Sequence, residues 1–281
     1  MAIHDQSYVR YTGPMREGSA AWIIARMNTR TMISFTRTKL LVLLSWLPAF
    51  LTLIALFAEY VFNSKANPSK MPSLGGVEFV IQLHTATVAL LLLSSGCGII
   101  ADDLRYKVIQ LYFSKPMTRL EYAAGKFLSL FALSSLVGLL PVGILGVARL
   151  GLYAKGPILA EVAIQTVAAL GVLVLATGAM CLMVMGLSSL TTRTGYVVLA
   201  WLSVLVPPLI ADAIIKIVSK EAVWSGLLSV WGNVDLLLEG MLGTEDLGWV
   251  GWWFPAGVLI VLAAIGAGLT ARRLSSIEGI A

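Results

Sequence analysis

The chain has 281 residues, of which 58% are hydrophobic and 12% are charged, and it carries a net charge of +5. This charged fraction is about half that of an ordinary soluble domain, which excludes a chain that covers itself with polar surface. We interpret the positive charge as a determinant of orientation in the membrane and of attraction to anionic lipid headgroups, and not as a sign of nucleic-acid binding.

Apolar runs long enough to cross a hydrocarbon core of about 30 Å recur along the chain. They lack the period-two alternation of barrel strands, and lipid cannot satisfy open backbone groups, so an all-α polytopic membrane protein is predicted. A transmembrane domain is expected over residues 40–270. Its six spans are predicted at Leu40–Phe62, Val77–Ile100, Phe127–Ala148, Leu159–Ser189, Tyr196–Val218 and Gly251–Thr270.

Residues 1–39 are predicted to be a cytoplasmic tail that ends in an amphipathic helix. Ser19 is the expected N-cap, and Trp22, Ile23 and Arg26 follow at helical spacing. Such a helix lies in the inner headgroup layer and leads into the first span. The alternative is a basic tail without fixed structure. A cleavable signal peptide is not expected, because the polar segment that precedes the first apolar run is long.

The segment between the second and third spans is expected to form a short amphipathic helix at about residues 102–115. Asp102 or Asp103 is the expected cap, Pro116 ends the helix, and Thr118 with Glu121 predicts a capping box for the next one. The helix is suited to dock on a soluble partner, although a helix lying on the bilayer fits the pattern equally well. One apolar stripe is formed by Leu104, Val108, Leu111 and Tyr112.

This arrangement resembles the permease subunits of type-2 ABC exporters. An acidic residue after the second span is followed there by a short helix, a Pro-x-x-Arg sequence and a Gly-Lys pair that opens the next span. Many members have a Glu and a Gly-Thr where this chain has its acidic pair and Ser-Lys-Pro-Met-Thr-Arg, which leaves the subfamily open. The matching positions are Asp102 or Asp103, Leu111, Pro116, Arg119, Gly125 and Lys126.

The resemblance implies that the loop helix is a coupling helix seated on a separate cytoplasmic ATPase, present in two copies. ATP and magnesium would bind that partner, and a second permease subunit, another copy of this chain or a similar one, would complete the transporter. No cofactor and no enzymatic activity are expected of the chain itself, since it has no phosphate-binding Gly-rich loop. The implied ATPase-coupling residues are Asp102, Asp103, Arg105, Val108, Leu111, Tyr112, Pro116 and Arg119.

A loop rich in tryptophan, at about residues 221–249, is expected on the outer side. Trp224, Trp231 and Trp249 are typical of an interfacial aromatic belt. The resemblance implies short interfacial or re-entrant helices there, with Asp235, Glu239, Glu245 and Asp246 in water.

Asp212 and Lys216 lie one helical turn apart near the outer end of the fifth span, so a structural ion pair is predicted. Other polar residues near outer ends, His84 and Gln165 among them, are interpreted as solvated helix ends, with a polar vestibule as the alternative. The two cysteines, Cys97 and Cys181, are expected to be packing residues.

Lysine and arginine are distributed unequally between the two sides of the predicted spans. Fourteen fall in the segments on the side of the N-terminus and six on the other side. The positive-inside rule therefore places both termini in the cytoplasm, including the tail at residues 271–281. We expect a multi-pass protein of the bacterial inner membrane.

The resemblance favours an ATP-driven exporter, but two other functions fit the spans. A secondary transporter or channel would need ionisable groups near the bilayer midplane, which the pattern does not show clearly. A membrane scaffold in a larger assembly would also need a cytoplasmic docking helix. A metal site is not expected, since His4 and His84 stand alone. The substrate cannot be deduced from this sequence.

Overall fold

The computed structural model describes residues 19–66, 75–113, 117–153, 158–219, 223–242 and 251–277, and all regular structure in these ranges is helical. Six helical segments are long and apolar enough to cross a membrane, at Thr36–Phe62, Glu78–Arg105, Arg119–Val137, Leu159–Ser189, Thr194–Val218 and Trp253–Ser276. The predicted all-α class is therefore confirmed in the described residues, and six helices have the length and apolarity expected of spans.

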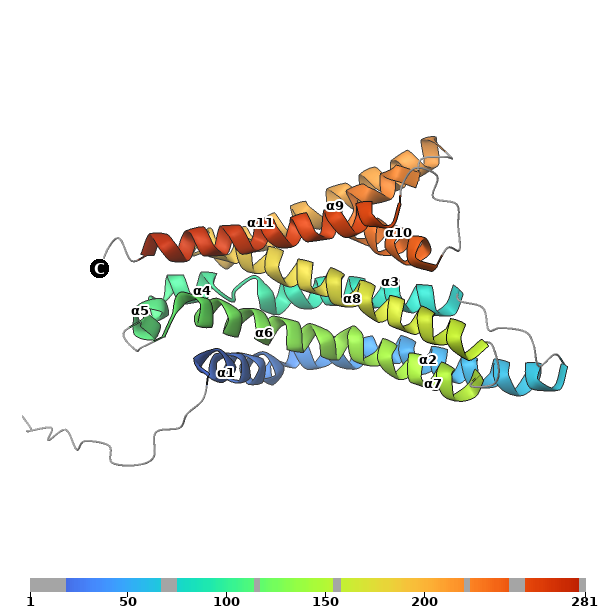
Figure 1. The fold of residues 1–281 in the computed structure, drawn as a ribbon. Coiled ribbons are helices and arrows are strands. Elements are labelled where there is room, and N and C mark those ends of the chain that lie inside the picture. Colours follow the sequence, from blue (N-terminus) through green and yellow to red (C-terminus); the bar gives the residue numbers. More distant parts are fainter. Residues whose placement is uncertain are drawn as a thin grey trace, which may run out of the picture.

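The helices pack lengthwise into one elongated bundle (Figure 1). In chain order they are α1 (Ala20–Ser34), α2 (Thr36–Ala66), α3 (Gly75–Leu91), the π-helical turn η1 (Leu92–Gly96), α4 (Ala101–Arg105), α5 (Val108–Phe113), α6 (Arg119–Val137), α7 (Leu139–Tyr153), α8 (Ile158–Ser189), α9 (Thr194–Val218), the 3₁₀ helix η2 (Val223–Leu228), α10 (Val230–Leu242) and α11 (Trp253–Ile277).

Different helices lie at the two ends of the bundle. Helices α1, α4 and α5 lie at one end together with the C-terminal end of α11, and we call this the α5 end (Figure 1). Helix α10 lies toward the other end, which we call the α10 end. The two described ends of the chain therefore lie at the same end of the bundle.

Helix α8 occupies the centre and contacts α3, α6, α7, α10 and α11. Inside the protein, 61% of its span window is buried, against 17% for the spans of α2 and α9. Leu43, Phe62 and Ile217 on the outer helices are exposed. Exposed apolar side chains in this density are typical of a surface that faces lipid, and α2 and α9 form the periphery of the bundle.

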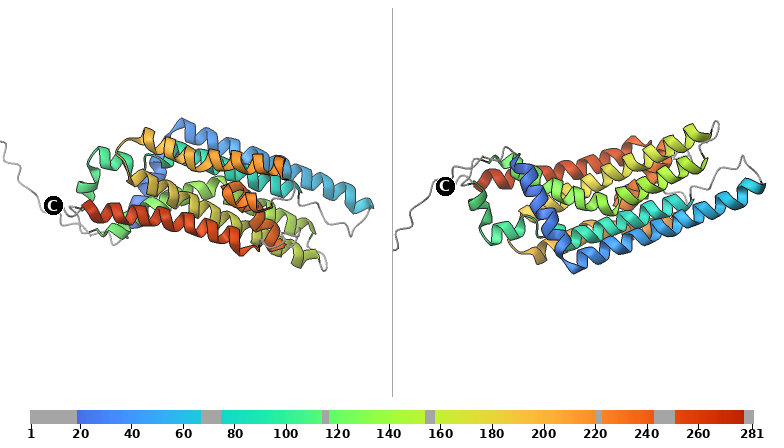
Figure 2. Two further views of the ribbon diagram at one scale, coloured as in Figure 1. Left: turned by 90° about the horizontal axis from the view of Figure 1, so that it is seen from above. Right: turned by 90° about the horizontal axis from the view of Figure 1, so that it is seen from below.

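Helix α1 crosses the spans at a steep angle and packs on α6 (Figure 2). Ser19 stands at its N-cap position, but the side chain makes no capping hydrogen bond. Ile24 is buried, whereas Trp22 and Ile23 are exposed. The close contact depends on Gly125, where a Cβ would lie 2.8 Å from the carbonyl oxygen of Ala21.

Two of the predicted spans are interrupted. The predicted segment Val77–Ile100 leaves α-helical geometry at η1 and continues as a turn before α4 begins. The predicted segment Phe127–Ala148 is divided at Gly138 between α6 and α7. Pro141 lies in the first turn of α7, where the missing amide hydrogen costs least.

Helix α10 packs against several neighbouring helices with its apolar face. It contacts α3, α8, α9 and α11, and Val234, Leu237 and Leu238 are buried. The short helices predicted near residues 221–249 are present as η2 and α10. Trp249 lies outside the described residues.

Candidate functional site

The connection between α3 and α6 consists of two short helices instead of one. Helix α4 ends at Arg105 and α5 begins at Val108, with a turn between them in which Lys107 has φ 56°. This left-handed conformation changes the chain direction, which is why the predicted continuous helix at 102–115 is wrong. The predicted helix end at Pro116 lies outside the described residues, as does the side chain of Leu111.

A buried ion pair joins this connection to α6. Lys126 Nζ lies 2.6 Å from Asp103 Oδ2, and the lysine side chain is only 3% exposed. The hydroxyl of Tyr122 donates to the same carboxylate at 2.7 Å. Asp103 therefore receives two donors from successive turns of α6.

Two tyrosine rings enclose the ammonium group. Lys126 Nζ lies 5.6 Å from the ring centre of Tyr122 and 6.0 Å from that of Tyr112, and the two ring centres are 5.5 Å apart. These distances fall within the range of cation–π attraction. Burial, and then the charge of Asp103, raise the pKa of the Tyr112 hydroxyl. The cluster thus brings α5 against α6 through one charged centre.

The neighbouring carboxylate points to a different span. Asp102 Oδ1 accepts a hydrogen bond of 2.7 Å from Thr194 Oγ1, and Thr194 is the first residue of α9. Adjacent residues of α4 are therefore attached to α6 and to α9. Neither aspartate caps α4, whose N-cap position is Ile100.

The start of α4 is capped by a residue from another span, and this explains the error in the predicted cap. Ser188 Oγ accepts from the amides of Ile100 and Ala101, both at 3.0 Å, and donates to the carbonyl oxygen of Cys97 at 2.8 Å. A serine on α8 thereby does what the aspartates were predicted to do. Ser188 is a residue of this site that sequence reasoning missed.

Three other predicted coupling residues have different surroundings. Arg105 is exposed, and its guanidinium lies 5.4 Å from the ring centre of Tyr106. Val108 is half-buried, and Arg119 is the first residue of α6. The predicted capping box at the start of α6 is confirmed, because Glu121 accepts from the Thr118 amide at 2.8 Å and its own amide donates to Thr118 Oγ1 at 3.2 Å.

The predicted ion pair near the end of α9 is also confirmed, with Lys216 Nζ 3.2 Å from Asp212 Oδ2. The sequence did not reveal the hydrogen bonds that surround Asp212. Ser225 Oγ donates to Asp212 Oδ1 at 2.7 Å, and Ser229 Oγ donates to Oδ2 at 3.3 Å. Asp212 is buried, so it holds η2 and the start of α10 against α9.

Asp235 on α10 was predicted to face water, and it is half-buried. Burial raises its pKa to about 6, with Lys216 acting in the opposite direction and Glu78 and Asp212 in the same direction. This partial burial follows from the packing of α10 against α8, α9 and α11. Of the other predicted water-facing residues, Glu239 is half-buried, and Glu245 and Asp246 lie outside the described residues.

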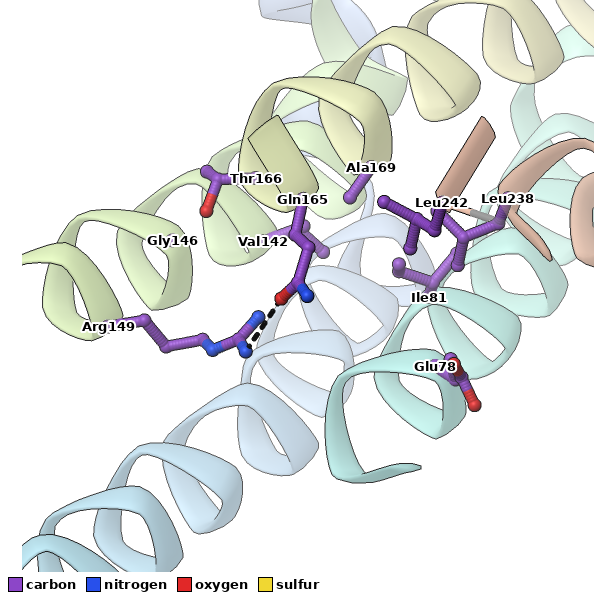
Figure 3. Close-up of a pocket in the computed structure, with 10 residues that line it drawn as sticks. All are labelled: Glu78, Ile81, Val142, Gly146, Arg149, Gln165, Thr166, Ala169, Leu238 and Leu242. Carbon is purple, nitrogen blue, oxygen red and sulfur yellow. Dashed lines mark hydrogen bonds between the residues drawn. The ribbon is translucent and has the colours of Figure 1, made fainter. Parts of the chain in front are cut away.

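A buried arginine lies toward the α10 end. Arg149 on α7 is 2% exposed, and its Nη2 donates to Gln165 Oε1 of α8 at 3.1 Å (Figure 3). They line a narrow cavity of about 10 Å³, the size of one water site, with Glu78 from α3 and Leu238 from α10. Gln165 was interpreted as a solvated helix end, and its burial with Arg149 overturns that interpretation.

A signal for this burial was present in the sequence. Arg149 is followed by Leu150, Gly151 and Leu152, which continue an apolar helix. His84 of α3 was also assigned to a solvated end, yet it is fully buried, and no hydrogen-bond partner of its ring nitrogens lies within the described ranges. Cys97 and Cys181 are buried free thiols, as expected of packing residues.

These clusters belong to a polytopic helical bundle with a polar centre toward each end. Within the described part of the chain, no group of three or more His, Cys, Asp or Glu side chains is placed to hold a metal ion. The polar groups at the α5 end connect helices to one another. No protein-family model matches this chain, and no curated protein matches it.

Proposed function

We propose that this chain is the permease subunit of an ATP-driven ABC exporter, which moves its substrate with energy from a separate ATPase subunit. The observation that carries the proposal is the ion pair between Asp103 and Lys126, which attaches the loop between α3 and α6 to the body of a span. The resemblance of this loop to that of type-2 ABC permeases also supports the proposal.

A coupling element must transmit displacement, which requires stiff attachments. Helix α4 has two, the ion pair to α6 and the hydrogen bond from Thr194 of α9 to Asp102. Removing one partner of a buried ion pair costs about 3–5 kcal/mol, so the α6 attachment resists separation. A partner that pushes on α4 and α5 would therefore move α6 and α9 together.

The exposed residues of the connection are suited to contact such a partner. Asp102, Arg105, Tyr106 and Lys107 are exposed at the α5 end, beside the ion pair. The bias of lysine and arginine supports placing this end in the cytoplasm, where ATP is available. Two ATPase subunits and a second permease subunit complete the proposed assembly.

The experiment isolates the full chain with its natural partners from gently solubilised membranes. Mass spectrometry is expected to find an ATPase with a phosphate-binding loop in a complex that contains two ATPase and two permease subunits. In proteoliposomes, Arg105→Glu is expected to lower ATP hydrolysis by the complex at least several-fold. The matched control is Arg272→Glu, an exposed arginine of α11 at the same end of the bundle, which should preserve hydrolysis.

Transport by the chain alone, without nucleotide, would refute the proposal. So would labelling from outside the cell of a cysteine placed at Tyr106, because the loop would then face away from ATP. Equal hydrolysis by the Arg105→Glu complex and the wild-type complex would remove the loop from the mechanism.

A second candidate function is a secondary transporter, and Arg149 is the observation that favours it. Ionisable groups inside spans mark ion and substrate pathways, and Arg149 with Gln165 is buried between α7 and α8. Substrate uptake driven by an imposed proton or sodium gradient, in liposomes that contain only this chain, would establish it. ATP-dependent transport that is insensitive to such gradients would exclude it.

A further inference from the structure

A groove runs along the bundle between α6, α8 and α11, on the side of the α5 end. Its volume is about 520 Å³. It is lined by Arg119, Leu120, Ala123, Ala124, Phe127, Leu182, Met185, Ala267, Thr270, Ala271 and Leu274.

Alanines create the hollow, and larger side chains form its walls. Ala123 and Ala124 of α6 face Ala267 and Ala271 of α11 across it, where longer side chains would fill the space. The lining offers almost no hydrogen bonding, since the hydroxyl of Thr270 already donates to the carbonyl oxygen of Gly266 at 3.0 Å. The interior of the groove therefore suits a hydrocarbon chain.

The groove has one charged lining residue, Arg119, at the start of α6. From Arg119 to Phe127 a helix rises about 12 Å, close to the hydrocarbon depth of one leaflet. Arg272 and Arg273 lie on α11 at the same end of the groove.

We propose that this groove binds an anionic phospholipid of the leaflet at the α5 end, with one acyl chain between α6 and α11 and the phosphate at Arg119. Basic pockets between spans on the cytoplasmic side recognise anionic headgroups in this way. The site does not depend on the ATPase assignment, because it requires only that the six spans lie in a bilayer.

Charge favours a lipid over a second copy of the chain. In a twofold dimer formed through this groove, the same surface would meet itself and Arg119 would approach its own copy. Arg272 and Arg273 would add to the repulsion. A phospholipid supplies the opposite charge and the apolar chain in one molecule.

The test titrates the purified full chain in detergent with phosphatidylglycerol or phosphatidylcholine and counts retained lipids by native mass spectrometry. Wild-type protein is expected to retain phosphatidylglycerol preferentially. Arg119→Gln should weaken this retention about fivefold, the effect of one basic residue near an anionic headgroup, and leave phosphatidylcholine unchanged. The matched control, Arg193→Gln, changes an exposed arginine at the α5 end that does not line the groove, and retention should stay within about twofold of wild type.

Ala271→Phe fills the groove and is expected to abolish retention of both lipids. Ala267→Leu provides a second filling variant at another exposed position, in case the first fails to fold. Equal retention of the two lipids by wild type would overturn the proposal, as would an Arg193→Gln loss equal to that of Arg119→Gln. A filling variant that dissociates a dimer without changing lipid retention would assign the groove to a second copy and also overturn it.

Discussion

Lys126 meets Asp103 at 2.6 Å, and this contact joins a short helix at the end of the bundle to the interior of a span. A lysine that is almost fully buried needs a partner, because desolvation of an unpaired ammonium costs several kcal/mol. The carboxylate also accepts from Tyr122, so its charge is shared between two donors. The position of α4 is therefore set by electrostatics, and Leu104 and Tyr112 of the loop pack against the apolar core beside it.

Asp103→Asn is expected to destabilise the protein by about 3–5 kcal/mol, because it leaves the charge of Lys126 buried without a counterion. Unfolding in mixed micelles by an SDS titration measures this loss. The double variant Asp103→Leu with Lys126→Met should recover most of the loss, since an apolar pair of similar volume replaces the charges. Asp102→Asn, at an exposed carboxylate, is the control and should cost less than about 1 kcal/mol. A double variant no more stable than Asp103→Asn would contradict this account.

Gly125→Ala is expected to push α1 away from α6. The added methyl group would lie 2.8 Å from the carbonyl oxygen of Ala21 and 2.8 Å from Cβ of Ile24, and neither atom can yield without moving the helix. Overpacking of this kind costs about 1–3 kcal/mol. Trypsin should then cut faster at Arg26 and Arg30 of α1. Gly171→Ala is the matched control, since no atom lies within 4 Å of the position that its added methyl group would take. Unchanged cleavage in both variants would show that the contact does not hold α1.

Asp212 should matter more for stability than Lys216, although the two form one ion pair. Asp212→Ala removes the acceptor of the Ser225 and Ser229 hydroxyls and is expected to cost about 1–3 kcal/mol. Lys216 is 52% exposed, so Lys216→Ala should cost less than about 1 kcal/mol. The two free energies of unfolding are compared in the same SDS titration. Equal losses would mean that the ion pair, and not the serine hydroxyls, carries the stabilisation.

Asp235 is expected to make stability depend on pH. Its pKa is raised from 3.8 to about 6, mainly by burial, so the folded protein binds a proton more tightly than the unfolded chain does. This contribution is complete below about pH 4 and is lost as pH rises through 6. Asp235→Asn lacks the titration, so its stability relative to wild type should rise between pH 4 and pH 7. Melting curves at pH 4, 5, 6 and 7 measure the difference.

A second variant checks the assignment of this pH dependence. Lys216 favours the charged form of Asp235, so Lys216→Met should shift the stability transition to higher pH. A transition that stays in place in Lys216→Met, or that persists in Asp235→Asn, would assign the titration to a different group.

The number of candidate spans was predictable from the sequence because lipid imposes a simple rule, although the third runs over Arg119–Val137 and not over Phe127–Ala148. A backbone that crosses hydrocarbon must satisfy its own hydrogen bonds, so each apolar run of sufficient length becomes a helix. The capping box at Thr118 and Glu121 and the ion pair between Asp212 and Lys216 were predictable for a similar reason. Each involves residues at most four positions apart, whose relative geometry the helix itself determines.

The contacts that organise each end of the bundle were not predictable in this way. Ser188 caps α4 from α8, and Asp103 meets Lys126 across two helices. Such partners are distant in sequence, and no local periodicity indicates which spans become neighbours. The left-handed conformation of Lys107, which ends the predicted continuous helix, also has no signal in the pattern of apolar residues.

The sequence by itself determined that this chain is a helical membrane protein with six candidate spans, because the desolvation of backbone groups depends only on local composition and length. The tertiary structure alone decided which polar groups are buried. His84 and Gln165 were interpreted as solvated helix ends, yet neighbouring helices bury both of them. Burial depends on which helices become neighbours, and the pattern of apolar residues along the chain does not indicate this.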